Sequence, residues 1–546
     1  MNILSICKRD GNKDTDKRQT IIIYALFTIW VIQFAFICFA NLHWSSHVID
    51  GDMADLYGHV REMWRNKTMF ISNWQYATTL ELDCASILAL PLYGLTKDIF
   101  LSFALSNIII LILWNLIVYR LVMNCSKSRI SALLSADLLM IPYGVGMLEY
   151  FNMLFFNGAQ YGIKTLIPLI FLCIITSDTE NQDKRNRIEI IIMLVLIGAL
   201  QFITSLSSGM YVMIAGLVPI ILYLIISWMN DHGRYSRQEI RTFSAAALVT
   251  VICSILGKII SNHFDVTARG TSTGVTVFNN FLLNFQTVIA GLFEVLSCSP
   301  ETTTPKVMSF EGVTYICKSF FTLTIIVICI YVQIKYALKR ERKYEKMFLL
   351  SLLLPWNMFI FIFSDTRYSA LNTYMEYRYY LIAYIPVIIL AGIMFGRYME
   401  HATLSLSLLI ITFVGIMAIG CDKQVSDFRE NTDYVYDIKN TLDALPQNTG
   451  SVFVMTDNDT ARKLRLIDEA RTYCGMYYDD IQGVGISDNY MDYTSSSNFS
   501  QNNIVLTVTG TNLTDYLSQD VAATYTKIGT IRWFDIYYSD ACTFGQ

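Results

Sequence analysis

The residues best suited to chemistry follow the first apolar stretch, in the segment NLHWSSHVIDGDMADLYGHVREMW. In this segment, Asp50 and Asp52 are separated by one glycine. A carboxylate beside an apolar wall has its charged form disfavoured, so its pKa rises towards the range that suits a general base. The same pair could bind a divalent cation, because hard cations prefer carboxylate oxygens, with His43 and His47 as further ligands. Asp52, followed by Asp55 three residues later, also fits the N-cap of a helix.

The residues after this acidic pair predict an amphipathic helix. Apolar side chains recur at helical spacing and favour a helix that lies along the membrane interface, namely Leu56, Val60, Met63 and Trp64. Asp55, His59 and Glu62 share the opposite face, which makes Asp55 and His59 candidates for an accessory role. Glu81 and Asp83, in TTLELD, form a second acidic pair that either serves the site or ends a solvated loop.

A cation suited to phosphate lies far along the chain, in MEYRYYLIAYIP. Arg378, next to Tyr379 at an apolar interface, can offer two parallel N–H donors to a phosphate. The alternative is an arginine that reaches lipid headgroups or pairs with Glu376. Arg367, in SDTRYS, is a second candidate in the same predicted loop.

The composition indicates that membrane helices position these residues. Of the 546 residues, 53% are hydrophobic and 16% are charged, against about 25% charged in a typical soluble domain. The mean hydropathy of +0.41 agrees. A formal net charge of −4 provides no basic field and argues against a nucleic-acid partner. The 12 cysteines include no C-x-x-C pair, so neither a zinc framework nor a disulfide scaffold is indicated.

Eleven stretches are predicted to be transmembrane helices, since a span needs about 20 mainly apolar residues. They are 21–40, 99–123, 130–148, 162–177, 188–206, 209–229, 241–261, 314–334, 347–364, 379–396 and 402–420. The stretch 84–95 is too short to span and is expected to be re-entrant or interfacial. The predicted fold class is an all-α polytopic membrane bundle with a C-terminal α/β or α+β domain.

The positive-inside rule orients this bundle. With a cytoplasmic N-tail of residues 1–20, the shorter connecting segments hold most of the Lys and Arg residues and lie inside. The transmembrane domain, 21–420, then carries two long outer loops, 42–98 and 262–313, and residues 421–546 form an extracytoplasmic domain. We expect the protein to lie in the plasma membrane with this C-terminal domain outside.

The tail after residue 420 alternates between helical and strand patterns, which predicts a small domain of mixed structure. Helices are expected at 431–445 and 460–467, and strands at 451–456, 503–509 and 531–538. The cluster Asp457-Asn458-Asp459 precedes a helix, so an N-cap is its expected role and a cation site is the alternative.

The second outer loop contains a further amphipathic pattern. Apolar residues recur at helical spacing from Phe278 to Leu296, with Asn279, Asn280 and Asn284 elsewhere on the helical wheel. Such a helix either lies on the membrane surface or packs against the bundle.

Together, these features resemble the GT-C superfamily of membrane-embedded glycosyltransferases, which use polyprenyl-phosphate sugars as donors. The resemblance lies in the many spans, the long first outer loop with its acidic motif, the interfacial helix that follows and the C-terminal outer domain. It implies that Asp50 or Asp52 is the catalytic base, that Arg378 grips the donor phosphate, and that the acceptor is a glycan or lipid of the cell envelope. Several relatives carry adjacent Asp and Glu, whereas this chain has Asp-Gly-Asp, which leaves the identity of the base and the use of a divalent cation open.

Two other functions fit parts of the same pattern. A transporter or lipid flippase often has inverted repeats and intramembrane charge, but Asp137, in SADLLM, is the only carboxylate expected well inside a span. An envelope polysaccharide polymerase or ligase would take a diphosphate-linked oligosaccharide in place of a monophosphate-linked sugar. The sequence does not separate this last class from a GT-C enzyme.

Overall fold

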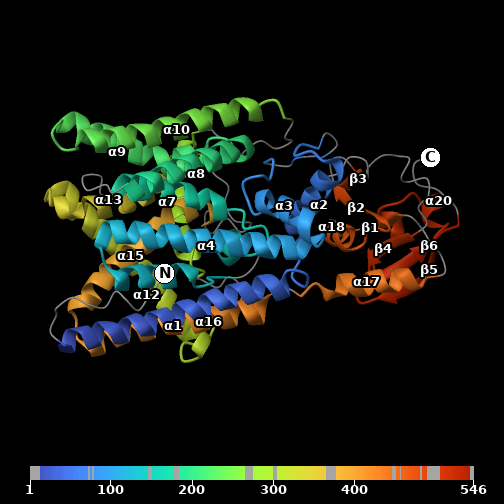
Figure 1. The fold of residues 1–546 in the computed structure, drawn as a ribbon. Helices are drawn as coiled ribbons and strands as arrows, with labels where there is room; N and C mark the ends of the chain where they lie inside the picture. The colour runs from blue at the N-terminus through green and yellow to red at the C-terminus, as the bar shows by residue number, and fades with distance from the viewer. Residues whose placement is uncertain are drawn as a thin grey trace.

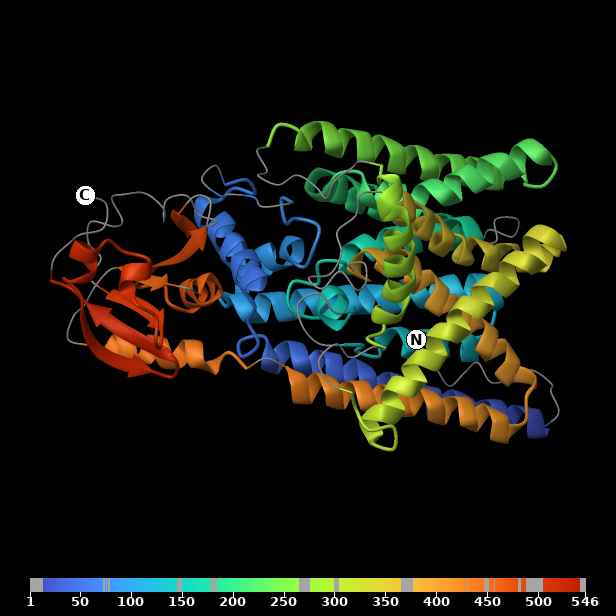
Figure 2. The ribbon, with the colours of Figure 1, turned by 180° about the vertical axis from the view of Figure 1, so that it is seen from behind.

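A bundle of long helices carries a small sheet domain at one end in the computed structural model of the protein (Figure 1). The bundle helices run roughly side by side, and the sheet lies beyond one end of them, next to α2 (Gly51–Asn66) (Figures 1 and 2). The structure describes residues 13–71, 74, 76, 79–144, 150–177, 184–264, 275–298, 304–364, 377–429, 431–445, 451–455, 457–479, 483–487 and 504–540.

Nine helical segments among these described residues are long and apolar enough to cross a membrane. They are formed by α1 (Lys13–Trp44), α4 (Ile99–Ser126), α8 (Lys184–Ser208), η2 with α9 (Met213–Leu217, Val218–Asn230), α10 (Arg237–Ser261), α12 with η3 (Phe310–Gln333, Ile334–Leu338), η4 with α13 and α14 (Arg342–Tyr344, Glu345–Ser351, Leu353–Phe363), η5 with α15 (Tyr377–Tyr380, Leu381–His401) and α16 (Leu404–Phe428). Each of them matches one of the predicted spans.

The other two predicted spans are shorter helices. The stretch 130–148 contains α5 (Arg129–Met140), which ends just before Pro142 because proline disfavours helical backbone at the preceding residue. The stretch 162–177 forms α7 (Gly162–Thr176), in which every residue is buried. A helix enclosed by protein can be shorter than the hydrocarbon core is thick, because its ends meet protein groups in place of lipid. The short helix α3 (Ser86–Thr96) occupies the predicted stretch 84–95.

Small residues let α5 and α15 approach closely inside the bundle. A Cβ on Gly392 would lie 2.7 Å from Ser135 Cα, and a Cβ on Gly396 would lie 2.7 Å from the backbone N of Ser131. Both serine hydroxyls donate hydrogen bonds to α15 carbonyl oxygens at 3.3 Å. Pairs of small residues four positions apart are a common packing device of membrane helices, and here they fix α15 against the bundle.

The stretch 262–313, predicted as the second outer loop, contains α11 (Phe278–Glu294), which confirms the predicted helix. It crosses the long helices at a steep angle (Figure 2). Val288 and Leu292 are buried, whereas Leu282 and Phe285 are exposed. Asn284 is buried and donates to two carbonyl oxygens at the end of α14 at 3.0 Å. The helix is therefore packed on the bundle through one side and leaves apolar residues of the other side exposed.

The C-terminal domain is a six-stranded mixed sheet with helices, as its composition predicts. The sheet order is β3-β2-β1-β4-β6-β5; β1 pairs in parallel with β2 and β4, and the other pairs are antiparallel. The elements are α17 (Asp433–Ala444), β1 (Ser451–Met455), α18 (Asn458–Ile467), β2 (Thr472–Asp479), β3 (Gly483–Ser487), β4 (Ile504–Val508), η7 (Leu513–Asp515), α20 (Gln519–Ala522), β5 (Thr526–Ile531) and β6 (Phe534–Tyr538).

Most of this domain's predicted elements are present, but its boundaries differ in detail. The helix α16 continues to Phe428, beyond the boundary expected at residue 421. Strands β2, β3 and β5 were not predicted. Asp457 caps α18, because its Oδ1 accepts a hydrogen bond from Thr460 N at 2.9 Å, which confirms the capping interpretation.

Candidate functional site

The helix α2 begins at Gly51 because Asp50 caps it. Asp50 has extended backbone (φ −95°, ψ 167°), and its Oδ1 accepts a hydrogen bond from Met53 N at 2.8 Å. The first N–H groups of a helix have no partner within the helix, so this acceptor stabilises its start. The prediction that Asp52 is the N-cap is therefore wrong. Asp52 lies in the first turn of α2, and its carboxylate is not used for capping.

Asp50 is also held through its second oxygen. Asn157 Nδ2 lies 3.4 Å from Asp50 Oδ2. Burial raises the pKa of Asp50 to about 6, and the hydrogen bond from Met53 N offsets only part of this rise. Asp50 is thus a mostly enclosed carboxyl group that titrates close to neutral pH.

Asp52 lies beside Arg462 of the C-terminal domain. Its side chain is 49% exposed, and Arg462 Nη1 lies 3.5 Å from its Oδ1. Partial burial raises the pKa of Asp52, while the nearby guanidinium groups of Arg462 and Arg378 lower it and the carboxylate of Glu81 raises it. In this fold, therefore, the charge of Arg378, the predicted phosphate ligand, acts on the pKa of Asp52 in the predicted acidic motif.

Arg378 lies in η5, at the start of α15. Its guanidinium carbon is 5.2 Å from the centroid of the Tyr379 ring. The carbonyl oxygen of Tyr379 accepts a hydrogen bond from the Tyr211 hydroxyl at 2.8 Å, which ties this turn to the chain before η2. Arg367 and Glu376, the second phosphate candidate and the alternative partner of Arg378, lie outside the described residues.

Two accessory candidates, His59 of α2 and Glu81, contact each other. His59 is fully buried, with Nδ1 3.4 Å from Glu81 Oε2 and Nε2 3.3 Å from the Tyr76 hydroxyl. Its ring stacks on Trp74 with centroids 4.8 Å apart. The carboxylate of Glu81 also raises the pKa of Asp52, so His59 and Glu81 are linked electrostatically to the acidic motif.

Asp83, the other member of the second acidic pair, is separated from solvent. Its side chain is 1% exposed and forms an ion pair of 3.4 Å with Lys164 of α7. The ammonium group of Lys164 also lies over the Tyr161 ring, 5.0 Å from its centroid. The interpretation of Asp83 as a solvated loop end is therefore wrong, because α7 supplies a buried cation that the loop sequence does not reveal.

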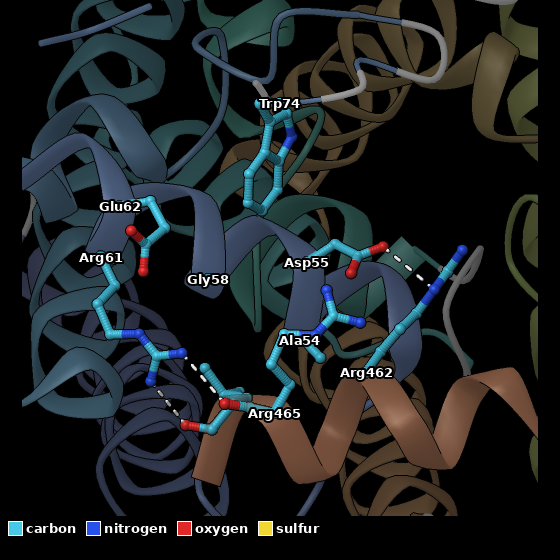
Figure 3. Close-up of a pocket in the computed structure, with 9 residues that line it drawn as sticks. Ala54, Asp55, Gly58, Arg61, Glu62, Trp74, Arg462 and Arg465 are labelled. Carbon is cyan, nitrogen blue, oxygen red and sulfur yellow. Dashed lines mark hydrogen bonds and ion pairs between the residues drawn. The ribbon is translucent and has the colours of Figure 1, made fainter. Parts of the chain in front are cut away.

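Asp55 is buried against α18 of the C-terminal domain (Figure 3). Arg462 Nε lies 3.3 Å from Asp55 Oδ2, so one guanidinium contacts both Asp55 and Asp52. Arg61 of α2 donates to two backbone carbonyl oxygens near the end of α18 at 3.0 and 3.1 Å. A small pocket between the two helices is lined by three of these side chains, Asp55, Arg61 and Arg462, together with Trp74 (Figure 3). Arg462 and Arg61 were not among the residues predicted from the sequence, since their roles depend on which helix packs against them.

The cation alternative finds little support in the described part of the chain. No group of three or more His, Cys, Asp or Glu side chains there is arranged to hold a metal ion. The helix α1 does continue past Ala40 and includes His43, although it ends at Trp44, before His47. However, His47 Nδ1 lies 2.6 Å from Asp433 Oδ1 of the C-terminal domain, so it serves a contact between domains.

The helix bundle, the segments packed on it and the C-terminal domain together have the architecture of a multi-pass membrane protein. The similar solved structures include ArnT from Cupriavidus metallidurans bound to undecaprenyl phosphate, with a TM-score of 0.54 and 11% sequence identity, covering 96% of this chain and 98% of that chain. The apo state of the same ArnT has a TM-score of 0.53 and 11% identity, covering 95% and 99%. No family model and no curated protein matches the sequence. The similarity is one of fold over nearly the whole chain.

Proposed function

We propose that the protein is a membrane glycosyltransferase that moves a sugar from a polyprenyl-phosphate donor to a glycan or lipid acceptor of the cell envelope. The proposal is supported by the similarity in fold to ArnT, one structure of which contains undecaprenyl phosphate. The observation that carries it to residues is that the charge of Arg378 is among those that lower the pKa of Asp52. The orientation that we propose has a cytoplasmic N-terminus and a C-terminal domain on the outer face of the plasma membrane.

In this proposal Asp52 is the general base. Asp50 already uses one oxygen to cap α2 and has the other beside Asn157, whereas Asp52 is half-exposed and free of capping. Asp52 would accept the proton of an acceptor hydroxyl as the acceptor oxygen bonds to the anomeric carbon of the sugar. The bond between that carbon and the phosphate oxygen breaks at the same time, and polyprenyl phosphate leaves.

Arg378 is the proposed ligand of the donor phosphate, with Arg367 as a second contact. A guanidinium can donate two parallel hydrogen bonds to phosphate and stabilise the charge that develops as it leaves. The ring of Tyr379 packs beside this guanidinium and limits its movement. We assign His59 and Glu81 a supporting role, since Glu81 raises the pKa of Asp52 and His59 contacts Glu81, and no divalent cation is required by this scheme.

The proposed function is tested by sugar transfer from a panel of polyprenyl-phosphate sugars with purified protein in nanodiscs. Asp52→Asn is expected to lower the transfer rate by about 10²- to 10⁴-fold, the usual contribution of a positioned base. Asp427→Asn is the matched control, because Asp427 on α16 is 51% exposed, much like Asp52, and forms its ion pair with Lys423 of the same helix. Arg378→Gln is expected to raise the KM for the donor.

Three results would point away from this function. Full transfer by Asp52→Asn rejects Asp52 as the base. Transfer only from diphosphate-linked oligosaccharides indicates a polymerase or ligase. Movement of lipid across the nanodisc or vesicle membrane without any glycosidic product indicates a flippase.

A further inference from the structure

The helices α2 and α18 lie alongside each other and run in the same direction. At their starts, a Cβ on Gly51 would collide with Asp459. In the middle, Asp55 pairs with Arg462, and further along Arg61 donates to the carbonyl oxygens near the end of α18. Because the contacts follow the same order along both helices, they set the register between the membrane domain and the C-terminal domain. Arg462 is therefore held at a defined position against α2.

The guanidinium of Arg462 is shared between two carboxylates of different exposure. Its Nε lies 3.3 Å from Asp55 Oδ2, and its Nη1 lies 3.5 Å from Asp52 Oδ1. Asp55 is 6% exposed, so it can serve as a fixed anchor, whereas Asp52 is open to solvent and to a substrate. One cation facing two carboxylates leaves this group with a net negative charge.

We propose that Arg462 is a positioning residue of the transfer reaction, supplied by the C-terminal domain, which orients the Asp52 carboxylate and balances its charge. Asp55 anchors Arg462 for this purpose. This inference rests on the proposed function and adds to it a role for the C-terminal domain in the chemistry. It also gives a reason for the register between α2 and α18, since a domain that only covered the loops would not need Arg462 between Asp52 and Asp55.

Electrostatics agree with this role. Burial is the largest influence on the pKa of Asp52 and raises it, and Arg462 is the next and lowers it. The other charged groups that face Asp52 come from four places, namely Asp459 of α18, Glu81 of the first loop, Arg378 of η5, and Asp50 and Asp55 beside it on the chain. Without Arg462, the acidic groups would dominate, and Asp52 would hold its proton at a higher pH. A donor phosphate would add a further negative charge beside it, which Arg462 also offsets.

The test is the pH profile of sugar transfer for four proteins: the natural chain, Arg462→Gln, Arg462→Lys and Arg61→Gln. Arg462→Gln is expected to move the acidic limb of kcat/KM to higher pH by roughly one unit, the low end for opposite charges at this separation in a half-exposed site. Arg462→Lys retains the charge, so its acidic limb is expected to stay close to that of the natural chain. Arg61→Gln weakens the docking of α18 without removing a partner of Asp52, so its acidic limb is expected to stay in place.

The possible outcomes separate this inference from the proposed function. A natural protein that transfers no sugar from any donor overturns both. An active natural protein together with an unshifted acidic limb in Arg462→Gln overturns the role of Arg462 and leaves the proposed function intact. An equal shift of the acidic limb in Arg61→Gln and Arg462→Gln shows that the shift comes from weaker docking of the C-terminal domain, which also overturns the role of Arg462. Thermal unfolding of each variant checks that the protein is folded at every pH used.

Discussion

The substitution Asp50→Asn is expected to stabilise the protein at neutral pH and to leave its stability nearly unchanged at pH 4. Asparagine is as good an N-cap as aspartate, so the hydrogen bond to Met53 N can be retained. What the substitution removes is a carboxyl group that the folded protein prefers in its neutral form. The effect therefore depends on pH in a direction that follows from the pKa of Asp50.

The sign and size of this effect follow from linkage. The pKa of Asp50 is raised from 3.8 to about 6 by burial, so the folded state binds the proton more tightly than the unfolded state. The stabilisation that protonated Asp50 gives the natural chain is fully present below about pH 4 and is lost as the pH rises through 6. A shift of this size corresponds to about 3 kcal/mol at 1.36 kcal/mol per unit, and water that reaches the partly exposed site reduces it to roughly 1–3 kcal/mol.

The assay is thermal unfolding followed by tryptophan fluorescence in one detergent between pH 4 and pH 8. The Tm of Asp50→Asn minus that of the natural chain should rise across pH 4 to 6 and level off above pH 7. Asp98→Asn is the control, because Asp98 caps α4 through Leu101 N at 3.1 Å and is exposed. A difference that is constant over this range, or that falls as the pH rises, would refute the account of Asp50.

Two further predictions concern packing and buried charge. Gly396→Ala is expected to lower the free energy of unfolding by about 1–3 kcal/mol, because its Cβ would meet the backbone of Ser131. Gly415→Ala is the control and should change the free energy of unfolding little, because a Cβ there has open space. Denaturation of both variants in the same detergent checks this, and equal stabilities would contradict it. Lys164→Met should cost about 3–5 kcal/mol by leaving Asp83 buried without a cation. Adding Asp83→Leu should recover most of that loss, and a double variant no more stable than Lys164→Met would show that the ion pair is not the cause.

The membrane architecture could be predicted because it depends on the length of apolar runs. A span needs about 20 apolar residues whatever its neighbours are, and the nine long helices found among the described residues follow that rule. The exceptions, α5 and α7, are short where the chain is enclosed by other helices, which is a property of the packed bundle. In the same way, an Asp before a helix is visible in the sequence, and the cap at Asp457 was predicted correctly.

The pairings of the candidate site could not be predicted, since they join elements far apart in the chain. Arg462 is one of several cations of an amphipathic helix in the tail, and no local pattern selects Asp52 and Asp55 as its partners. In the sequence, Lys164 is likewise only a residue near the start of an apolar helix. Its partner Asp83 lies in a distant loop, and the folded structure brings the two together. Tertiary packing decides which opposite charges meet. The sequence could identify the acidic motif and Arg378 as candidates, and it could not show the cation that lies between the two domains.

The identity of a cap has consequences beyond the end of a helix. Each residue turns an α-helix by about 100°, so a helix that starts one residue earlier or later presents a different face. The caps at Asp50 and Asp457 start α2 and α18 a few residues after the ends of α1 and β1. They fix the rotation of α2 and α18, and through it the meeting of Asp52 with Arg462. The predicted cap of α2 was two residues too late, whereas the choice of base between Asp50 and Asp52 was left open by the sequence. The cap at Asp50 gives that residue a structural task and leaves Asp52 as the proposed base.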